Sequence, residues 1–215
     1  MLLRLKNGLK NFKEVTYKKH EQLYQDLEQV QNPHTLFIAC SDSRVNPERL
    51  IGSNPGEIFT IRNIANTVPT YEVSHNDFTT VSAIEFAIEV LKVREVIICG
   101  HSNCGGCAAA LEGQEKLAQL PYTQQYLKPL EKVKVKVEHS HYHKDEESKA
   151  RLMEQMNVIT QLNNLKSYPH IQQLIAKGEL EVEGWHYDIK SGDVFVYDET
   201  THSFCKSDEY QNIHQ

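Results

Sequence analysis

The chain has 215 residues, of which 40% are hydrophobic and 24% charged, a composition typical of a single globular domain that buries a sizeable core. Its formal net charge of -6 excludes the basic surface by which proteins bind nucleic acids, and no apolar run approaches the roughly 18 residues of a membrane span. Because the start of the chain also lacks the pattern of a secretory signal, we expect a cytoplasmic protein that binds a small molecule or another protein.

Residues 4–31 predict an N-terminal helical extension, because apolar side chains recur at nearly helical spacing among Lys, Glu and Gln. Such an amphipathic segment is expected to pack on its own domain or on a partner subunit. Asn32-Pro33 ends it, since the residue before a proline is biased out of the α conformation. We therefore divide the chain into an extension (1–31), one folded domain (32–200) and a C-terminal tail (201–215).

Three short apolar runs predict buried strands at 36–39, 58–61 and 96–99. Between the last two, the apolar positions of 78–91 recur every three or four residues and predict a helix. A strand, a helix and a further strand in this order pair in parallel through a right-handed crossover. We expect an α/β fold with a mostly parallel central sheet, flanking helices over much of 120–178, and an antiparallel hairpin formed by 180–187 and 193–197.

Two of these strands end in loops that carry metal-ligand side chains. Cys40 follows the first strand, and His101 and Cys104 follow the third. Ligands of open α/β sheets gather beyond the carboxyl ends of the strands, so we expect these three side chains to converge. Two thiolates and an imidazole make a tetrahedral zinc site with one position free for chemistry.

Other interpretations of these residues are weaker. Buried cysteines are often simple apolar residues, and Cys107 completes a CxxC pattern with Cys104 that is typical of redox or zinc sites. We favour Cys107 as a first-turn helix residue that is not a ligand. The alternating His139, His141 and His143 indicate a solvated loop rather than a second metal site. The odd total of five cysteines does not indicate a disulfide framework.

Four motifs, in this order and spacing, resemble those of β-class carbonic anhydrases from about Asn32 to Tyr197. They are Cys40-Ser41-Asp42-Ser43-Arg44-Val45, Pro55-Gly56-Glu57, Arg62-Asn63-Ile64-Ala65-Asn66 and His101-Ser102-Asn103-Cys104-Gly105-Gly106. The resemblance implies one Zn²⁺ held by Cys40, His101 and Cys104, and reversible hydration of carbon dioxide to bicarbonate by a metal-bound hydroxide. It also implies a homodimer or a dimer of dimers.

Asp42 and Arg44 are the expected catalytic residues. A carboxylate engaged by a guanidinium stays ionised and fixed in direction, so Asp42 can accept the proton of the metal-bound hydroxide and orient its oxygen. The resemblance implies a second state, in which this Asp leaves the Arg and becomes the fourth zinc ligand. That closed state cannot hydrate carbon dioxide.

Similarity to the plant-type members implies further substrate-binding residues. Gln31 matches a glutamine beside the substrate, and the small apolar pocket of these enzymes maps onto Phe59, Ile64 and Phe86. Gly105 and the glycine after it are explained by close approach of the helix start to the metal loop. They are alternatively explained by an anion cradle of backbone N–H groups that suits bicarbonate.

The open form is favoured over a form closed by bicarbonate. Arg62 and Tyr187 match two residues of the regulatory bicarbonate site, but Phe37 stands where those members have a tryptophan. Arg62 is equally well explained as a side chain that ties loops together by hydrogen bonds to backbone carbonyls.

Two other functions remain alternatives. One is a structural or regulatory zinc protein whose site is filled by Asp42, against which Arg44 and Gln31 argue. The other is a hydrolase of carbon disulfide or carbonyl sulfide on the same scaffold. Nothing in the sequence indicates the restricted access that such an enzyme needs.

Overall fold

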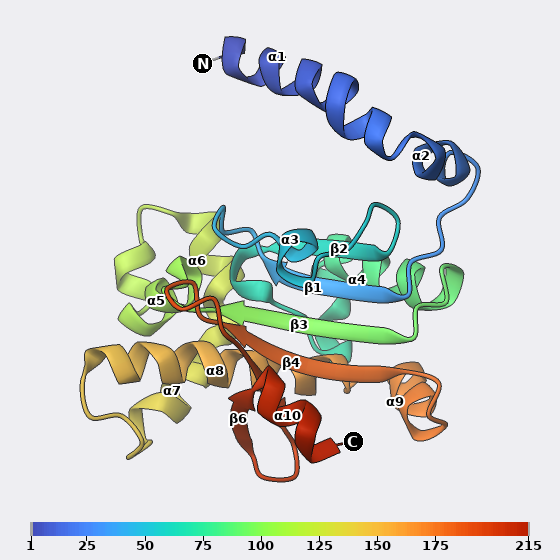
Figure 1. Cartoon of the computed structure of the whole chain (residues 1–215). Coiled ribbons are helices and arrows are strands. Elements are labelled where there is room, and N and C mark those ends of the chain that lie inside the picture. The colour runs from blue at the N-terminus through green and yellow to red at the C-terminus, as the bar shows by residue number, and fades with distance from the viewer. Residues whose placement is uncertain (1, 215) are drawn as a thin grey trace.

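A six-stranded sheet forms the centre of the computed structural model, which describes residues 2–214 (Figure 1). Its strand order is β2-β1-β3-β4-β5-β6. The first four pair in parallel, and β5 and β6 continue the sheet in antiparallel fashion, which confirms the predicted fold class. The strands are β1 (Thr35–Cys40), β2 (Ile58–Asn63), β3 (Glu95–His101), β4 (Glu181–Tyr187), β5 (Val194–Asp198) and β6 (Ser203–Lys206).

Helices make up most of the remaining structure, and no helix among the described residues is long and apolar enough to cross a membrane. The α-helices are α1 (Leu2–Asn11), α2 (Glu21–Leu27), α3 (Pro47–Ile51), α4 (Phe78–Glu85), α5 (Gly105–Glu112), α6 (Pro121–Leu127), α7 (Glu131–Glu138), α8 (Glu146–Leu165), α9 (Pro169–Ala176) and α10 (Ser207–His214). A π-helical turn, η4 (Phe86–Val90), continues α4. The helix predicted at 78–91 is therefore confirmed.

Strands β1 and β3 of the parallel part are buried on both faces, as is typical of such sheets. Leu36 and Ile38 of β1 pack on one face against apolar residues of α4, η4, α8 and α9. Phe37 and Ala39 point to the other face, where they pack with residues of α3 and with Trp185. A third apolar cluster, beyond the carboxyl end of β1, joins α5, α6, α7 and α8.

Helix α8 lies unusually close to β3 and β4. A Cβ atom placed on Gly184 of β4 would lie 2.5 Å from Cδ1 of Leu162, and one on Gly100 of β3 would lie 2.6 Å from Cγ2 of Val158. Both positions need glycine because the helix occupies the space of a side chain. The contact fixes the middle of α8 beneath the end of β3, where the metal loop begins.

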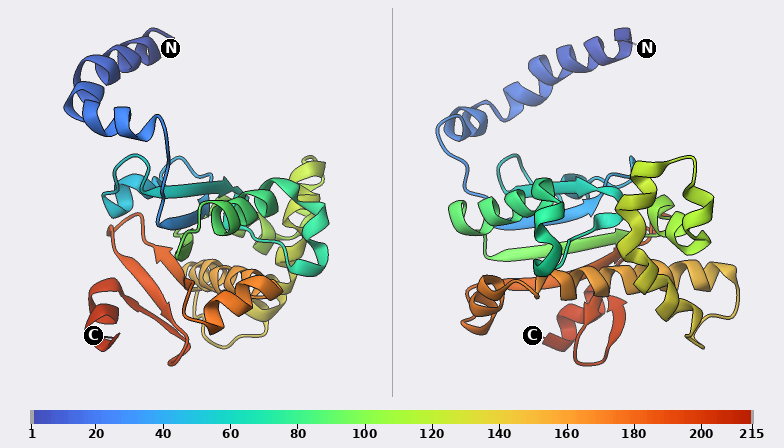
Figure 2. Two further views of the ribbon diagram at one scale, coloured as in Figure 1. Left: turned by 90° about the vertical axis from the view of Figure 1, so that its right-hand side faces the viewer. Right: turned by 180° about the vertical axis from the view of Figure 1, so that it is seen from behind.

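The N-terminal segment stands away from the sheet (Figures 1 and 2). Its apolar side chains Leu5, Leu9 and Phe12 are exposed. Near its end it contacts the domain, where Leu27 covers Gly56 so closely that a Cβ there would lie 2.5 Å from the Leu27 side chain. The predicted helical extension is present; Leu27 packs on the domain, whereas Leu5, Leu9 and Phe12 remain exposed.

The C-terminal hairpin is confirmed by the antiparallel pairing of β4 with β5. The sequence analysis missed the strand β6, which pairs with β5, and the helix α10 after it. These elements lie in the segment 201–215 that we described as a tail. Strand β6 has only four residues at the edge of the sheet, too few to show an alternating pattern.

Candidate active site

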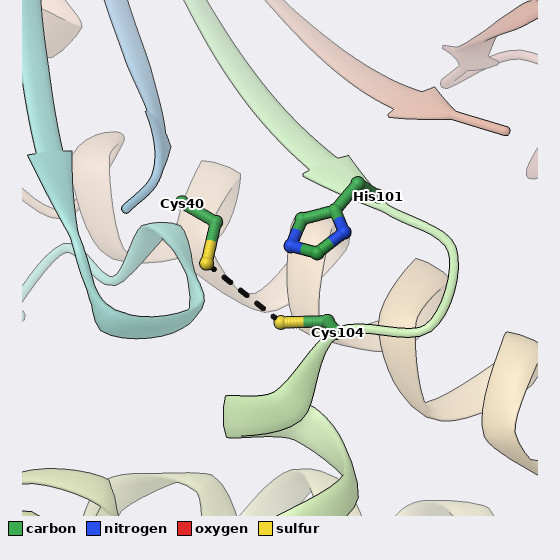
Figure 3. A group of neighbouring side chains, drawn as sticks. All are labelled: Cys40, His101 and Cys104. Atoms are coloured by element: carbon green, nitrogen blue, oxygen red, sulfur yellow. Dashed lines mark hydrogen bonds between the residues drawn. The ribbon is translucent and has the colours of Figure 1, made fainter. Parts of the chain in front are cut away.

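Three predicted metal ligands meet at the carboxyl end of the parallel strands (Figure 3). Cys40 ends β1, His101 ends β3, and Cys104 immediately precedes α5; all three are buried. Their ligand atoms lie within 4.8 Å of one another, and the two Sγ atoms are 3.9 Å apart. Two Zn–S bonds of about 2.3 Å at a tetrahedral angle separate the sulfurs by about 3.8 Å. The spacing therefore fits a zinc ion without rearrangement.

The imidazole of His101 has the orientation of a metal ligand. Its Nδ1 lies 3.0 Å from the backbone carbonyl oxygen of Ser102, which fixes the tautomer with the proton on Nδ1. Its buried Nε2 has no hydrogen-bond partner among the described residues. A buried nitrogen without a partner is costly, and a cation between the two sulfurs supplies one.

Without a metal ion, the thiols of Cys40 and Cys104 are stabilised in their protonated form. Contact with Cys104, together with burial, raises the pKa of Cys40 to about 12. Contact with Cys107 and burial likewise raise the pKa of Cys104 to about 12. A thiolate-binding cation must displace these protons, so metal binding releases them and depends on pH.

The competing ligand candidates lie outside this centre. Cys107 is buried in the first turn of α5 and does not belong to the three-residue group. His139, His141 and His143 lie in the loop between α7 and α8. Within the described residues, the three-residue group at Cys40 is the one cluster with the geometry of a metal site.

Asp42 lies beside the ligands and is held by Arg44. The guanidinium Nε donates to Oδ1 at 2.9 Å and Nη2 donates to Oδ2 at 2.7 Å, and the Arg44 backbone N–H adds a bond of 2.9 Å to Oδ1. These bonds hold the pKa of Asp42 well below its usual range. Oδ2 lies 3.9 Å from Nε2 of His101. The carboxylate thus stays ionised, and Arg44 engages it in the way we expect of the open form.

Arg62 ties the same loop to β2. Its guanidinium donates to the carbonyl oxygen of Cys40, at 3.1 Å from Nε and 3.0 Å from Nη2, and to that of Asp42 at 2.6 Å. The loop-tying interpretation accounts for all of these contacts.

Phe37, at the position of the regulatory tryptophan, is buried with its ring centroid 5.8 Å from that of Trp185. Tyr187 contributes its backbone carbonyl, which accepts from the N–H of Ser102 at 2.9 Å.

The two glycines after Cys104 differ. A Cβ on Gly106 would lie 2.9 Å from Cγ2 of Ile64 and 3.0 Å from Cβ of Ala65, so close approach explains this glycine as predicted. A Cβ on Gly105 would meet no atom within 4 Å. Close approach is therefore the wrong explanation for Gly105, which instead leaves open space at the N-terminus of α5.

The predicted substrate-binding residues do not all lie near the metal ligands of their own chain. Ile64 does, since it contacts Gly106. Phe59 does not: it pairs with Leu36, whereas Cys40 pairs with Asn63, which places Phe59 about 13 Å along the strand at 3.3 Å per residue. The Phe86 ring packs against Phe59 at 6.1 Å between centroids. Gln31 precedes the amino end of β1 and is exposed.

Sequence reasoning missed two buried residues behind Cys104. Oε1 of Glu154 accepts the Cys104 backbone N–H at 3.1 Å, and its Oε2 lies 3.1 Å from Nε2 of His186. Cys104, Glu154 and His186 are too far apart in the sequence to form one motif. The available signal was an acidic side chain on the face of α8 that also carries the buried Val158 and Leu162.

Comparisons with known proteins agree with this geometry. A family profile described as "Carbonic anhydrase" matches residues 35–194. A carbonic anhydrase of Helicobacter pylori is 36% identical over 200 residues, which cover 92% of this chain and 90% of that protein. The solved structure of the β-carbonic anhydrase CcaA matches with a TM-score of 0.90 at 35% identity, covering 95% of this chain and 98% of the other. One of two tetrameric β-carbonic anhydrases of Sordaria macrospora matches with a TM-score of 0.76 at 28% identity, over 96% of both chains. The chain therefore belongs to the carbonic anhydrase family, and within it to the β class.

Proposed function

We propose that the chain catalyses the reversible hydration of carbon dioxide at one Zn²⁺ held by Cys40, His101 and Cys104. The observation that carries this proposal is the buried Nε2 of His101, which has no hydrogen-bond partner among residues 2–214 and lies beside two sulfurs at zinc spacing. Zinc bound there would act as a Lewis acid and lower the pKa of a water molecule toward neutrality. Because two thiolates cancel its formal charge, we expect activity to rise on the alkaline side of neutrality.

Asp42 orients the oxygen that attacks carbon dioxide. Since Arg44 holds both of its oxygens, the carboxylate stays ionised and accepts a hydrogen bond from the attacking oxygen, whose lone pair is then directed toward the carbon. Arg44 also keeps Asp42 from filling the free ligand position. In this proposal, Ile64 and the open space beside Gly105 receive the substrate.

A second copy of the chain completes the site in this proposal. Gln31 precedes the amino end of β1, Phe59 pairs with Leu36 near that end, and Phe86 packs against Phe59, whereas Cys40 lies at the carboxyl end of β1. A homodimer, or a dimer of dimers, brings these residues of one subunit to the metal ligands of the other. The tetrameric relative from Sordaria macrospora supports such an assembly.

The test is stopped-flow hydration of carbon dioxide at about pH 8.5, on the alkaline side that two thiolate ligands favour, with zinc content measured on each protein. We expect about one zinc per wild-type chain, loss of zinc and activity in Cys104→Ala, and loss of activity with zinc retained in Asp42→Ala. Wild-type protein that holds zinc and does not hydrate carbon dioxide would contradict the proposal.

A further inference from the structure

We propose that Glu154 positions the metal ligand Cys104 by accepting its backbone N–H, and that His186 holds Glu154 in place. The inference rests on the proposed metal site, and it assigns a positioning role to two residues that contact neither the substrate nor the metal. Glu154 and His186 are both buried, and neither belongs to the motifs that identify the family.

The N–H of Cys104 needs an acceptor from outside its own helix. Cys104 is the residue before α5, with extended dihedrals of φ -70° and ψ 115°, so its N–H lies outside the hydrogen bonding of that helix. The residue is 1% exposed, which excludes bulk water as a partner. Oε1 of Glu154 accepts this bond at 3.1 Å. Without it, a buried donor would be left unpaired directly beside the ligand sulfur.

Glu154 is itself held on both sides. Its Oε2 lies 3.1 Å from Nε2 of His186, and His186 stands opposite Gly100 in the pairing of β3 with β4. One turn before Glu154 on α8, Arg151 donates to Asp188 at 2.7 Å. One turn after it, Asn157 donates to the Ala65 carbonyl at 2.9 Å. These contacts, with the glycine-dependent approach of α8, fix where the carboxylate meets Cys104.

A positioning role depends on the reach of the side chain, whereas a role for the buried charge does not. Glu154→Gln keeps the length and an oxygen acceptor but removes the charge. Glu154→Asp keeps the charge but is one methylene shorter, so it cannot reach Cys104 and His186 from the same backbone position. The two variants therefore separate the two roles.

The experiment measures the rate at which zinc leaves the loaded protein for an excess of a coloured chelator. We expect Glu154→Asp to release zinc about 10- to 100-fold faster than wild type, the range typical of lost ligand support. We expect Glu154→Gln to stay within about threefold of wild type. In the cobalt-substituted protein, the thiolate-to-cobalt absorption band should change in Glu154→Asp and not in Glu154→Gln.

Glu183→Asp is the matched control. Glu183 lies on β4, pairs with Ile97 four residues before His101, and its Oε2 accepts the indole N–H of Trp185 at 2.7 Å. The same one-methylene shortening there removes a carboxylate hydrogen bond away from the metal ligands, so it should leave zinc release unchanged.

The inference is overturned if Glu154→Asp releases zinc at the wild-type rate, or if Glu183→Asp accelerates release as much as Glu154→Asp does. It is also overturned if Glu154→Gln accelerates release tenfold. Should Glu154→Asp not fold, Glu154→Ala, which removes the acceptor of the Cys104 N–H altogether, takes its place with the same expected acceleration and the same contradicting result. A wild-type chain that retains no metal would reject the proposed metal site as well, whereas a metal-binding wild type with an unaffected Glu154→Asp would reject this inference alone.

Discussion

A single guanidinium joins the two loops that carry the metal ligands. Arg44 binds the carboxylate of Asp42 on the loop after β1, and its Nη2 also donates to the carbonyl of Asn103 at 2.9 Å on the loop after β3. Asn103 adopts a φ of +57°, a left-handed conformation that asparagine tolerates better than most residues. The orientation of Asp42 and the shape of the second loop therefore depend on the same side chain.

Replacing Arg44 should uncouple these two features. In Arg44→Ala, the carboxylate loses both guanidinium bonds and is free to turn toward the metal, so we expect kcat/KM to fall about 100-fold, as small misplacements in active sites do. Zinc content should stay near that of wild type, because none of the three ligands is changed. Stopped-flow kinetics with metal analysis measures both. Arg49→Ala, on the exposed side of α3, is the control, and near-normal activity of Arg44→Ala would contradict the role of this pair.

The Asp42–Arg44 pair also predicts a pH dependence of stability. The folded-state pKa of Asp42 is depressed, chiefly by the Arg44 side chain. A depressed carboxyl pKa contributes stability above the unfolded value of about 4, and this stability is lost as the pH falls below it. The difference in unfolding temperature between metal-free wild type and Arg44→Ala should therefore be constant above about pH 5 and shrink at lower pH. A difference that grows on acidification would contradict this assignment.

At the scale of elements, hydrophobic runs were sufficient to predict the core strands and the edge strand β2, and insufficient to predict the opposite edge strand, β6. Strands β1 and β3 are buried on both faces and appear in the sequence as continuous apolar runs. Strand β6 has one free edge, and of its four residues Ser203 and Lys206 are exposed, so local sequence carries little signal for it.

The residues of the candidate site also fall into those that the sequence could predict and those that it could not. Ligands next to strand ends could be predicted because the carboxyl ends of parallel strands share one edge of the sheet. Glu154 and His186 could not, because the contact between them depends on how deeply α8 packs on Gly100 and Gly184. That depth is a property of the tertiary structure rather than of any motif.

The close packing of α8 predicts the cost of adding one methyl group there. In Gly184→Ala, the new Cβ meets the fully enclosed side chains of Leu162 and Val158 at 2.5 and 2.8 Å, so the helix or the strand must shift. We expect the free energy of unfolding to fall by about 1–3 kcal/mol, as in other overpacked cores. Urea denaturation measures it. Gly8→Ala on the exposed α1, where a Cβ meets nothing within 4 Å, is the control, and equal stabilities of both variants would contradict the tight contact.

At the scale of the whole molecule, a single chain leaves apolar side chains exposed on α1 and around α4. The stripe of α1 includes Leu5 and Leu9, which are exposed, and around α4 the side chains of Phe78 (74% exposed), Phe86 and Val90 are exposed as well. Exposed apolar residues gathered in this way indicate protein contacts. A second copy that covers the region around Phe86 is the assembly that our proposed site needs.

Subunit mixing tests whether two copies share each site. Cys104→Ala removes a metal ligand, and the double variant Gln31→Ala/Phe86→Ala removes the residues assigned to the partner's site; each protein alone should be weakly active. In a mixed dimer, one site carries both defects and the other carries neither. After dissociation and reassociation of an equal mixture, half of the dimers are mixed, so about a quarter of the wild-type activity should return. If Gln31 and Phe86 served the metal of their own chain, every site in a mixed dimer would keep one defect and mixing would restore nothing.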